Sequence, residues 1–330
     1  MELADARWFA VDLHVPDRRF AMRLLEDSVI ERSSFLDTRI EAPPGETQPL
    51  TVAEVEAAAA GLPRAPVGWI FHTSFCASTL LARCLHLAPF TVALKEPLVL
   101  RRLSDARHAG WSIEGLVAPS LALLARPWRA GGAVVIKPTH VALNVAAELM
   151  AALPESRAVI VTSSLADFLV SNLKKPPDSQ AKIPVLVERA LRATGFGERL
   201  SPAGRQPPDL VSAAGLQWAA QQEEVREVVA AAGPARVRVL EMSAMLGDLV
   251  GAVATCAAWL QLAVPAAALA AHVREVGQRN AKAIEVPMDP ERRAYEAGIV
   301  VQRHREALMR ASEWLQAHVI PAMQHAPDTR

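Results

Sequence analysis

The sequence predicts an α/β fold in which helices cover both faces of a mostly parallel central sheet. One observation is a short apolar run, Val67–Phe71, that leads through a polar loop into a helical pattern beginning near Leu80. A second is that strand and helix alternate in this way four times between residues 67 and 174. The spacing suits right-handed parallel crossovers. These features predict a three-layer α/β/α arrangement whose ligands lie beyond the carboxyl ends of the strands.

Residues 1–62 are expected to form an N-terminal extension packed on the core. Within it, the pattern predicts a strand at Trp8–Leu13, an amphipathic helix at Arg18–Glu31 and an Ala-rich helix at Val52–Ala60. Pro63 and Pro66 end the last helix just before the first core strand. The main α/β domain is expected to span residues 63–330.

The expected core strands share a short apolar run that ends in polar residues. They are Val67–Phe71, Thr91–Leu94, Ala133–Ile136, Ala158–Val161 and Val237–Leu240. The expected helices after the first unit are Ile113–Trp128, Val141–Leu153, Leu165–Lys174, Leu210–Ala232, Ser243–Gln261 and Glu291–His318. Frequent Pro and Gly between residues 175 and 208 predict a mobile helical cap with one helix, Val185–Thr194.

The composition indicates a globular protein and disfavours several classes. Of the 330 residues, 51% are apolar, and 35 basic residues balance 35 acidic ones, which argues weakly against a nucleic-acid partner. The three cysteines and nine histidines show no zinc-binding spacing and no disulfide framework, which favours a reducing compartment. No signal peptide and no apolar run of membrane-spanning length is visible. We therefore expect a soluble, cytoplasmic protein with no membrane span, and the sequence leaves its oligomeric state open.

Polar side chains gather where the predicted strands end. In order along the chain they are Ser78 and Thr79, then Lys95 and Glu96, then Lys137, Thr139 and His140, then Thr162, Ser163 and Ser164. In a parallel sheet these ends meet at one edge, which would bring two ammonium groups, a carboxylate, an imidazole and several hydroxyls together. Such a set suits transfer of a charged group, phosphoryl or sulfuryl, with Glu96 or His140 accepting a proton. Each residue alone is more simply explained as a solvated loop charge or a helix cap.

The loop after the first strand lacks the features of an ATP-binding loop. A phosphate loop of the GxxxxGK[ST] type needs glycines that let the backbone wrap the phosphates and a lysine that reaches the terminal one. This sequence has no glycine between Gly68 and Gly110 and no lysine in the loop. ATP chemistry of the usual kind is therefore disfavoured.

Taken together, these residues resemble the sulfotransferase family that uses 3′-phosphoadenosine 5′-phosphosulfate (PAPS), and in particular its divergent bacterial members. Ser74–Leu81 lies in the register of the family loop for the 5′-phosphosulfate, and Lys95–Pro97 is similar to the Glu-Pro element after the second strand. Val135–His140 and Leu153–Val159 resemble the third strand end and the run entering the fourth strand. Asp167 and Ser171 match the element for the 3′-phosphate. The resemblance covers residues 67–175 and implies a P-loop-like fold, related to that of nucleoside triphosphate hydrolases.

The resemblance also implies an activity and a set of site residues. The activity is transfer of a sulfuryl group from PAPS, without a metal, to a hydroxyl or amine of a small-molecule, carbohydrate or lipid acceptor. Glu96 would be the base, with His140 as the competing candidate, and Lys137 would stabilise the transferred group. The implied PAPS-binding residues are Thr73, Ser74, Phe75, Cys76, Ala77, Ser78, Thr79, Ser163, Ser171, and the later pair Arg279 and Lys282. That pair is more simply explained as exposed loop charges.

Three positions depart from the family pattern and keep other functions open. Phe75 replaces the loop cation, Ala77 replaces the loop glycine, and Ser163 replaces the arginine for the 3′-phosphate. A positive φ at Ala77 would cost about 1 kcal/mol or more. These departures favour, as an alternative, a catalytically impaired protein that binds a nucleotide or a protein partner. A kinase or another nucleotide enzyme with an altered phosphate loop is a further alternative.

Overall fold

A five-stranded sheet forms the centre of the protein in the computed structural model, which describes residues 1–323. The strand order is β5 (Thr91–Lys95), β6 (Ala133–Lys137), β4 (Val67–His72), β7 (Arg157–Thr162) and β8 (Val237–Glu241). The pairs β5–β6, β6–β4 and β4–β7 are parallel. This confirms the predicted α/β class, and the predicted strands differ from these bounds by no more than one residue at either end.

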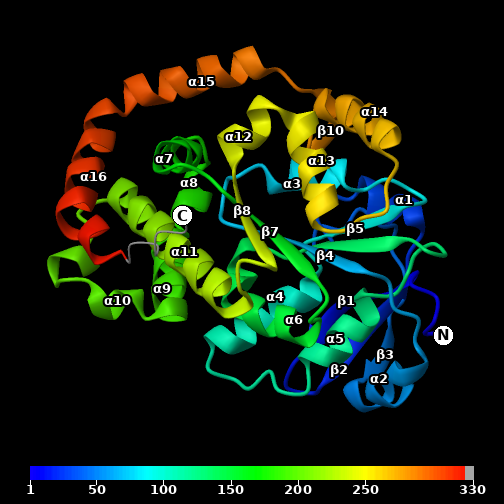
Figure 1. The fold of residues 1–330 in the computed structure, drawn as a ribbon. Helices are drawn as coiled ribbons and strands as arrows, with labels where there is room; N and C mark the ends of the chain where they lie inside the picture. The colour runs from blue at the N-terminus through cyan, green and yellow to red at the C-terminus, as the bar shows by residue number, and fades with distance from the viewer. Residues whose placement is uncertain (324–330) are drawn as a thin grey trace. The chain divides into compact units, whose positions relative to one another are not determined.

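The sheet belongs to the first of two compact units, which comprises Met1–His72, Ala77–Val161 and Pro234–Met288. One face of the sheet carries α3 (Ser78–Cys84), α13 (Leu249–Trp259) and α14 (Ala266–Gly277), as Figure 1 shows. The other face carries α4 (Leu98–His108), α5 (Val117–Leu124) and α6 (Ala146–Ala152) (Figure 1). The central strands are almost wholly buried because helices cover both faces, which is why they read as continuous apolar runs.

The N-terminal part of the chain differs from the sequence prediction. The expected helix at Arg18–Glu31 is wrong, because strand β2 (Arg19–Leu24) and the short helix α1 (Asp27–Arg32) occupy that stretch. Phe20 and Met22 alternate with outward residues and are buried, a period of two that fits a strand. Strand β2 pairs antiparallel with β1 (Trp8–His14) and with β3 (Gln48–Thr51). Antiparallel pairing therefore outweighed the helical periodicity of the same residues.

Two long helices of the prediction are each divided. The stretch 243–261 holds α12 (Met242–Gly247) and α13, because Asp248 accepts a hydrogen bond from the Gly251 N–H and caps a new helix. The stretch 291–318 divides at His304 into α15 (Pro290–Arg303) and α16 (Arg305–His318). Helices α4 and α14 had no counterpart in the prediction. The remaining elements of the first unit are α2 (Val52–Ala58), η1 (Ala59–Gly61), η2 (His140–Val145), β9 (Arg279–Asn280) and β10 (Ala283–Pro287).

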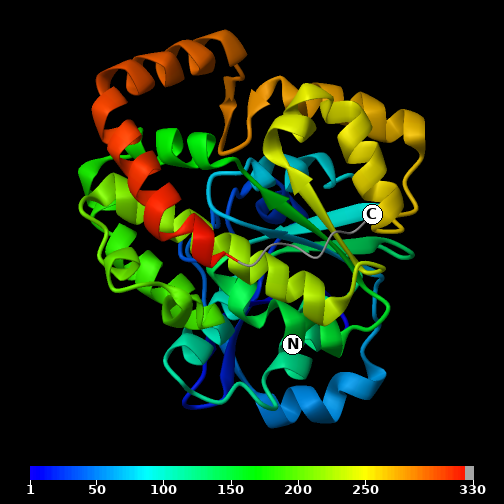
Figure 2. The ribbon, with the colours of Figure 1, turned by 60° about the vertical axis from the view of Figure 1, so that its left-hand side comes forward.

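The second unit is helical and comprises Thr73–Cys76, Thr162–Gly233 and the described chain from Asp289 onward. Its longest helix, α11 (Leu210–Ala232), contacts α7 (Leu165–Leu173), α9 (Ile183–Thr194) and α16. Figure 2 shows α16 in red against α11 in yellow-green. The core between these helices includes Phe168, Phe196, Leu216 and Leu315, all fully buried. The short elements α8 (Pro177–Gln180), α10 (Phe196–Arg199), η3 (Ala203–Arg205) and η4 (Ile320–Ala322) complete the unit.

A search of the helices within residues 1–323 finds none that is both long enough and apolar enough to cross a membrane.

Candidate functional site

A buried ion pair lies at the carboxyl ends of β5 and β6 in the first unit. Glu96 follows β5 directly, and Lys137 is the last residue of β6. The Lys137 Nζ donates to Glu96 Oε1 at 2.7 Å, and the two side chains are 1% and 11% exposed. Two of the three residues predicted to be catalytic are therefore in direct contact.

The backbone of Glu96 explains how this carboxylate reaches Lys137. Lys95 and Lys137 are in register on neighbouring strands, so regular alternation would direct Glu96 away from the face that they share. Glu96 instead adopts a left-handed conformation with φ of 56°, and its N–H donates to the Lys137 carbonyl at 2.6 Å. A left-handed conformation costs a non-glycine residue about 1–2 kcal/mol. Strain of this kind gathers at functional positions, which supports the view that the pair is a site.

Further cationic groups surround the same carboxylate. Arg39 Nη2 lies 3.4 Å from Glu96 Oε2, while His72 Nε2 lies 4.0 Å from Oε1. The His72 ring is held by the carbonyl of Pro138 at 3.0 Å. The predicted base His140 begins η2, and its ring centroid lies 6.3 Å from that of His72. The Glu96 carboxylate thus lies within 4.0 Å of an ammonium, a guanidinium and one imidazole, and a second imidazole lies near the first.

The surroundings keep Glu96 ionised. Burial raises the pKa of its carboxyl, but the opposing charges of Lys137, His72 and His140, together with the hydrogen bond from Lys137, outweigh burial and hold the pKa at about 2. A carboxylate with so low a pKa is a weak proton acceptor for as long as Lys137 stays on it. In this pair Glu96 and Lys137 are both ionised, and Glu96 cannot act as an effective base until Lys137 moves away.

Arg39 reaches this site from the N-terminal region. It pairs with Asp37, and its guanidinium lies 3.6 Å above the ring of Phe35. Lys282 lies on the same ring, with its Nζ 5.7 Å from the centroid. The chain between β9 and β10 is anchored there because Arg83 donates to the Ala281 carbonyl at 2.6 Å. One of the two predicted late cations, Lys282, thus shares Phe35 with Arg39, whereas Arg279 contacts the Ile284 carbonyl at 3.5 Å within the hairpin.

Lys95 does not contribute the second ammonium that the strand ends suggested. Its Nζ donates to the carbonyls of Ile30 at 2.7 Å and Glu31 at 3.0 Å, near the end of α1. Burial first, and then the charge of Arg83, lower the pKa of Lys95 to about 7. The expectation that both ammonium groups meet at one place is therefore wrong, because the Lys95 side chain is fully buried against main-chain carbonyls.

The predicted phosphosulfate loop begins in the second unit with Thr73–Cys76. Within it, the N–H, hydroxyl and carbonyl groups of Ser74 all form hydrogen bonds. Its N–H donates to Gln221 Oε1 at 3.1 Å, its hydroxyl accepts from Gln221 Nε2 at 3.2 Å, and its carbonyl accepts from Ser163 Oγ at 3.4 Å. The Cys76 thiol donates to the Thr73 carbonyl at 3.1 Å. This part of the loop is therefore ordered by α11 and by the end of β7.

Phe75 stands where the resemblance places a cation. It has a φ of 60° and packs edge-on against Phe168, with ring centroids 5.4 Å apart. The Lys175 Nζ lies 5.4 Å from the centroid of the Phe75 ring. Lys175 thus places a positive charge beside the position from which the loop cation is missing.

In the first unit, Ala77 takes the left-handed conformation that the sequence analysis treated as costly, with a φ of 60°. It directly precedes α3, whose first two residues, Ser78 and Thr79, are buried. The backbone conformation typical of glycine is therefore present at Ala77, at a cost of about 1–2 kcal/mol.

The residues matched to a 3′-phosphate site have structural partners. Ser163 donates to Ser74, and its carbonyl accepts from Trp218 Nε1 at 2.9 Å. Asp167 bonds to Ser164, which caps α7. Ser171 lies half-buried within α7. The contacts of Ser163 and Asp167 therefore serve the loop and the helix start.

Three side chains of these clusters were not predicted from the sequence. His72 could have been predicted from the sequence, because it ends β4 just as Glu96 and Lys137 mark the ends of their strands. Arg39 lies in an irregular stretch far along the chain from Glu96, and Gln221 lies inside a long helix. No spacing rule connects either of those two to its partner.

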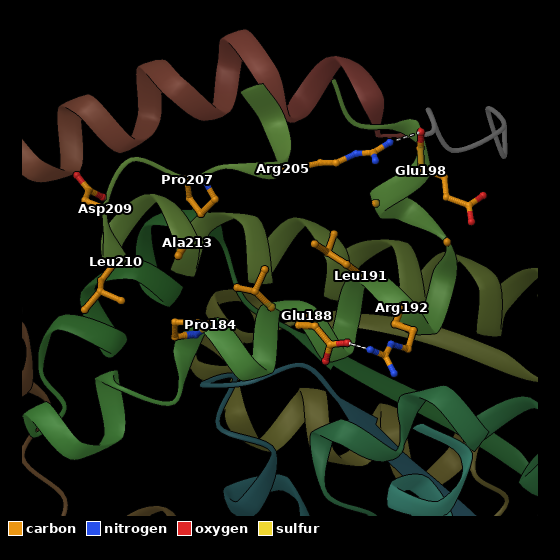
Figure 3. A pocket seen from close by; sticks show the side chains of 13 residues that line it. Pro184, Glu188, Leu191, Arg192, Glu198, Arg205, Pro207, Asp209, Leu210 and Ala213 are labelled. Atoms are coloured by element: carbon orange, nitrogen blue, oxygen red, sulfur yellow. Dashed lines mark hydrogen bonds and ion pairs between the residues drawn. The ribbon is translucent and has the colours of Figure 1, made fainter. Parts of the chain in front are cut away.

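A separate apolar pocket lies within the second unit (Figure 3). Its volume is about 780 Å³, and its apolar lining is Pro184, Val187, Leu191, Pro207, Leu210 and Ala213. At its rim Glu188 pairs with Arg192, as Figure 3 shows. A pocket of this size and lining suits an apolar small molecule.

Within residues 1–323, no cluster of three or more His, Cys, Asp or Glu side chains is placed to hold a metal ion.

Comparison with known proteins gives structural likeness only. No family model and no curated protein sequence matches the chain. Among solved structures, the chain is similar to a sulfotransferase from Alicyclobacillus acidocaldarius, with 14% identity and a TM-score of 0.40 over 78% of this chain and 96% of the other. It is also similar to the sulfotransferase domain from the curacin biosynthetic pathway, with 10% identity and a TM-score of 0.35 over 73% and 97%. Scores this low carry no argument about chemistry, which has to come from the site itself.

Proposed function

We propose that the protein is a sulfotransferase-like enzyme that moves a sulfuryl group from PAPS to a hydroxyl or amine acceptor. The observation that carries the proposal is the buried Glu96–Lys137 pair at 2.7 Å with Arg39 on the other carboxylate oxygen. A proton acceptor and cations that can neutralise a transferred anionic group meet at one place, as direct group transfer requires.

In the proposed reaction, the acceptor oxygen or nitrogen attacks the sulfur while the bond from sulfur to the leaving phosphate oxygen breaks. The acceptor loses its proton to Glu96, and the leaving group departs as adenosine 3′,5′-bisphosphate. The Lys137 ammonium moves from Glu96 toward the sulfuryl oxygens as negative charge develops there. Each bond that forms is matched by one that breaks, and the proton ends on the carboxylate.

Lys137 would thereby link donor binding to activation of the base. Its charge is the strongest influence that lowers the Glu96 pKa. When the ammonium turns toward the donor, the pKa of the carboxyl rises and the group becomes a better proton acceptor. Arg39, which is held by Asp37 and Phe35, remains beside the carboxylate during this step.

We propose that residues of the loop and its neighbours bind the donor. Ser78 and Thr79 are proposed to bind the 5′-phosphosulfate, and Lys175 is proposed to supply the positive charge that Phe75 does not. Lys282, which shares Phe35 with Arg39, is proposed to contact the nucleotide. His140 remains the second candidate for the base, and we propose a small-molecule, carbohydrate or lipid acceptor in the cytoplasm.

Thermal unfolding with adenosine 3′,5′-bisphosphate tests donor binding without knowledge of the acceptor. A ligand at about 100 times its dissociation constant adds about 2.7 kcal/mol of stability, which raises the unfolding midpoint by several degrees. We expect that shift with the bisphosphate and none with ATP and Mg²⁺. No shift at millimolar bisphosphate would overturn the proposal, and a shift with ATP and Mg²⁺ alone would point to a kinase or another nucleotide enzyme.

A second function, binding without catalysis, is favoured by the loop itself. The main chain of Ser74 is held by Gln221 and Ser163, and Phe75 is packed on Phe168. A protein that kept the fold but lost the chemistry would bind the bisphosphate, or a protein partner, and release no bisphosphate from PAPS. Chromatography of PAPS after prolonged incubation with the protein and a panel of hydroxyl and amine acceptors separates this function from the first.

A further inference from the structure

We propose that Gln221 is a positioning residue that directs the Ser74 hydroxyl proton toward an anionic oxygen of the bound ligand. The inference rests on the proposed function, because the resemblance to the sulfotransferase family places the loop Thr73–Cys76 among the residues that bind the donor. It adds a role on α11 for a residue outside the stretch that resembles the sulfotransferase family.

The two hydrogen bonds between Gln221 and Ser74 fix which way the amide faces. A backbone N–H can only donate, so the atom of Gln221 that lies 3.1 Å from the Ser74 nitrogen must be the amide oxygen. The amide nitrogen then lies 3.2 Å from the Ser74 hydroxyl oxygen and donates to it. Ser74 and Gln221 are 7% and 2% exposed, so water competes weakly for either bond.

This amide orientation has a consequence for the hydroxyl proton. A serine hydroxyl carries one proton and two lone pairs. Because Gln221 fills one lone pair as a donor, the proton of Ser74 is turned away from Gln221. Ser163 fixes the same residue from the other side by donating to its carbonyl. Ser74 thus becomes a directed donor on a rigid main chain, which suits recognition of a sulfate or phosphate oxygen.

A change of Gln221→Glu reverses this direction with almost no change in shape. One carboxylate oxygen still accepts from the Ser74 N–H, but the other replaces a donor with an acceptor. The Ser74 hydroxyl would then donate to the new carboxylate and be lost to the ligand. Gln222→Glu is the matched control, because it adds the same charge one residue along α11, at a side chain that is only half-buried.

Isothermal titration of the full-length protein with adenosine 3′,5′-bisphosphate and with inorganic pyrophosphate tests the proposal. We expect Gln221→Glu and Ser74→Ala each to weaken binding about tenfold to a hundredfold, the range of a hydrogen bond to a charged group. The double variant should bind about as weakly as Gln221→Glu alone, because both changes remove one interaction. Gln222→Glu should change affinity by less than about threefold, and thermal unfolding should show all variants folded.

The outcomes separate this inference from the proposed function. Additive losses in the double variant, or wild-type affinity in Gln221→Glu, would overturn the role of Gln221 while leaving PAPS use intact. Binding of pyrophosphate but not of the bisphosphate, with the non-additive pattern kept, would support Gln221 and overturn the nucleotide donor. Binding of neither ligand by the wild type would overturn both. If Gln221→Glu does not fold, Gln221→Met, which removes both hydrogen bonds at similar volume, takes its place in the same cycle.

Discussion

Two lysines in register on neighbouring strands of the sheet have opposite environments. Lys95 and Lys137 end β5 and β6, and both side chains are almost completely buried. Lys137 faces a carboxylate at 2.7 Å, whereas Lys95 faces two main-chain carbonyls of the α1 region. Position at a strand end therefore brings a side chain to the sheet edge but does not determine which groups it contacts. The groups supplied by neighbouring segments decide it.

The two lysines also differ in the charge of the groups that they contact. At Lys137 two opposite charges compensate each other, and the partner Glu96 stays ionised. At Lys95 two main-chain carbonyls accept hydrogen bonds from the ammonium, and burial first, and then the charge of Arg83, lower its pKa to about 7. Lys137 can therefore leave Glu96 for a new anion, whereas Lys95 is held by hydrogen bonds to main-chain carbonyls.

Replacement of Lys137 with Met should be the most destabilising of these changes. It leaves Glu96 buried without its main counter-charge, and removal of one partner from a buried ion pair typically costs about 3–5 kcal/mol. Urea-induced unfolding near neutral pH measures this loss. Lys95→Met is the matched control and should cost much less, because it removes a partly neutral group. An equal loss for the two variants would contradict the contrast between these environments.

Protonation of Glu96 should contribute to the loss of folding stability at acidic pH. Because its pKa in the folded protein, about 2, lies below the ordinary value of 4.5, the pair stabilises the fold above pH 4.5. That contribution is lost as the pH falls from about 4.5 toward 2, at up to about 1.4 kcal/mol per pH unit. Unfolding curves at a series of pH values should show a shallower acid limb for Glu96→Gln than for the wild type. Parallel acid limbs would argue against a depressed Glu96 pKa.

Lys95 predicts a slope in the alkaline range. Its pKa is lowered in the folded protein, so between about pH 7 and 10.5 the unfolded chain binds more protons at this residue than the native one. Stability from this group therefore rises with pH in that window, by no more than about 1.4 kcal/mol per pH unit. The difference in unfolding free energy between the wild type and Lys95→Met, measured from pH 7 to 10, isolates the slope. A pH-independent difference would show that Lys95 stays charged.

Arg39→Gln should have the smallest effect on folding. The guanidinium is 54% exposed, and its pair with Glu96 is long at 3.4 Å, so we expect a loss within about 1 kcal/mol. If Arg39 helps to hold Glu96 ionised during transfer, the apparent pKa of the acid limb of turnover should rise in this variant. A folding loss of several kcal/mol would contradict a weak ion pair between Arg39 and Glu96. An unchanged pH profile of activity would contradict a role for Arg39 in turnover.

The sequence predicted the sheet well because buried parallel strands have a distinctive local pattern. Val67–Phe71 and Ala133–Ile136 are apolar throughout and are bounded by Pro or Gly before and by His or Lys after. Both lie within one residue of the observed strands. The same pattern predicted that Glu96 and Lys137, at the ends of neighbouring strands, lie close together. It failed at Arg18–Glu31, where Phe20 and Met22 alternate with outward residues as in a strand and pair with β1.

Other parts of the site lay beyond any local pattern. Lys95 was expected beside Glu96, but its direction depends on α1, whose carbonyls lie more than sixty residues earlier in the chain. Arg39 and Gln221 reach their partners across 57 and 147 positions. The left-handed turn at Glu96, which brings the carboxylate to Lys137, is not favoured by its residue type. Contacts of this kind arise only when the fold is complete.

The proposed catalytic centre is tested by the rate at which adenosine 3′,5′-bisphosphate is released from PAPS at saturating donor, with water or an acceptor from the panel. Glu96→Gln should lower kcat by about 10²–10⁴, the usual contribution of a general base, while binding of the bisphosphate stays close to that of the wild type. Glu155→Gln, at an exposed carboxylate of the same unit, is the control and should leave kcat unchanged. Wild-type turnover in Glu96→Gln would contradict the assignment of this buried pair as the catalytic centre.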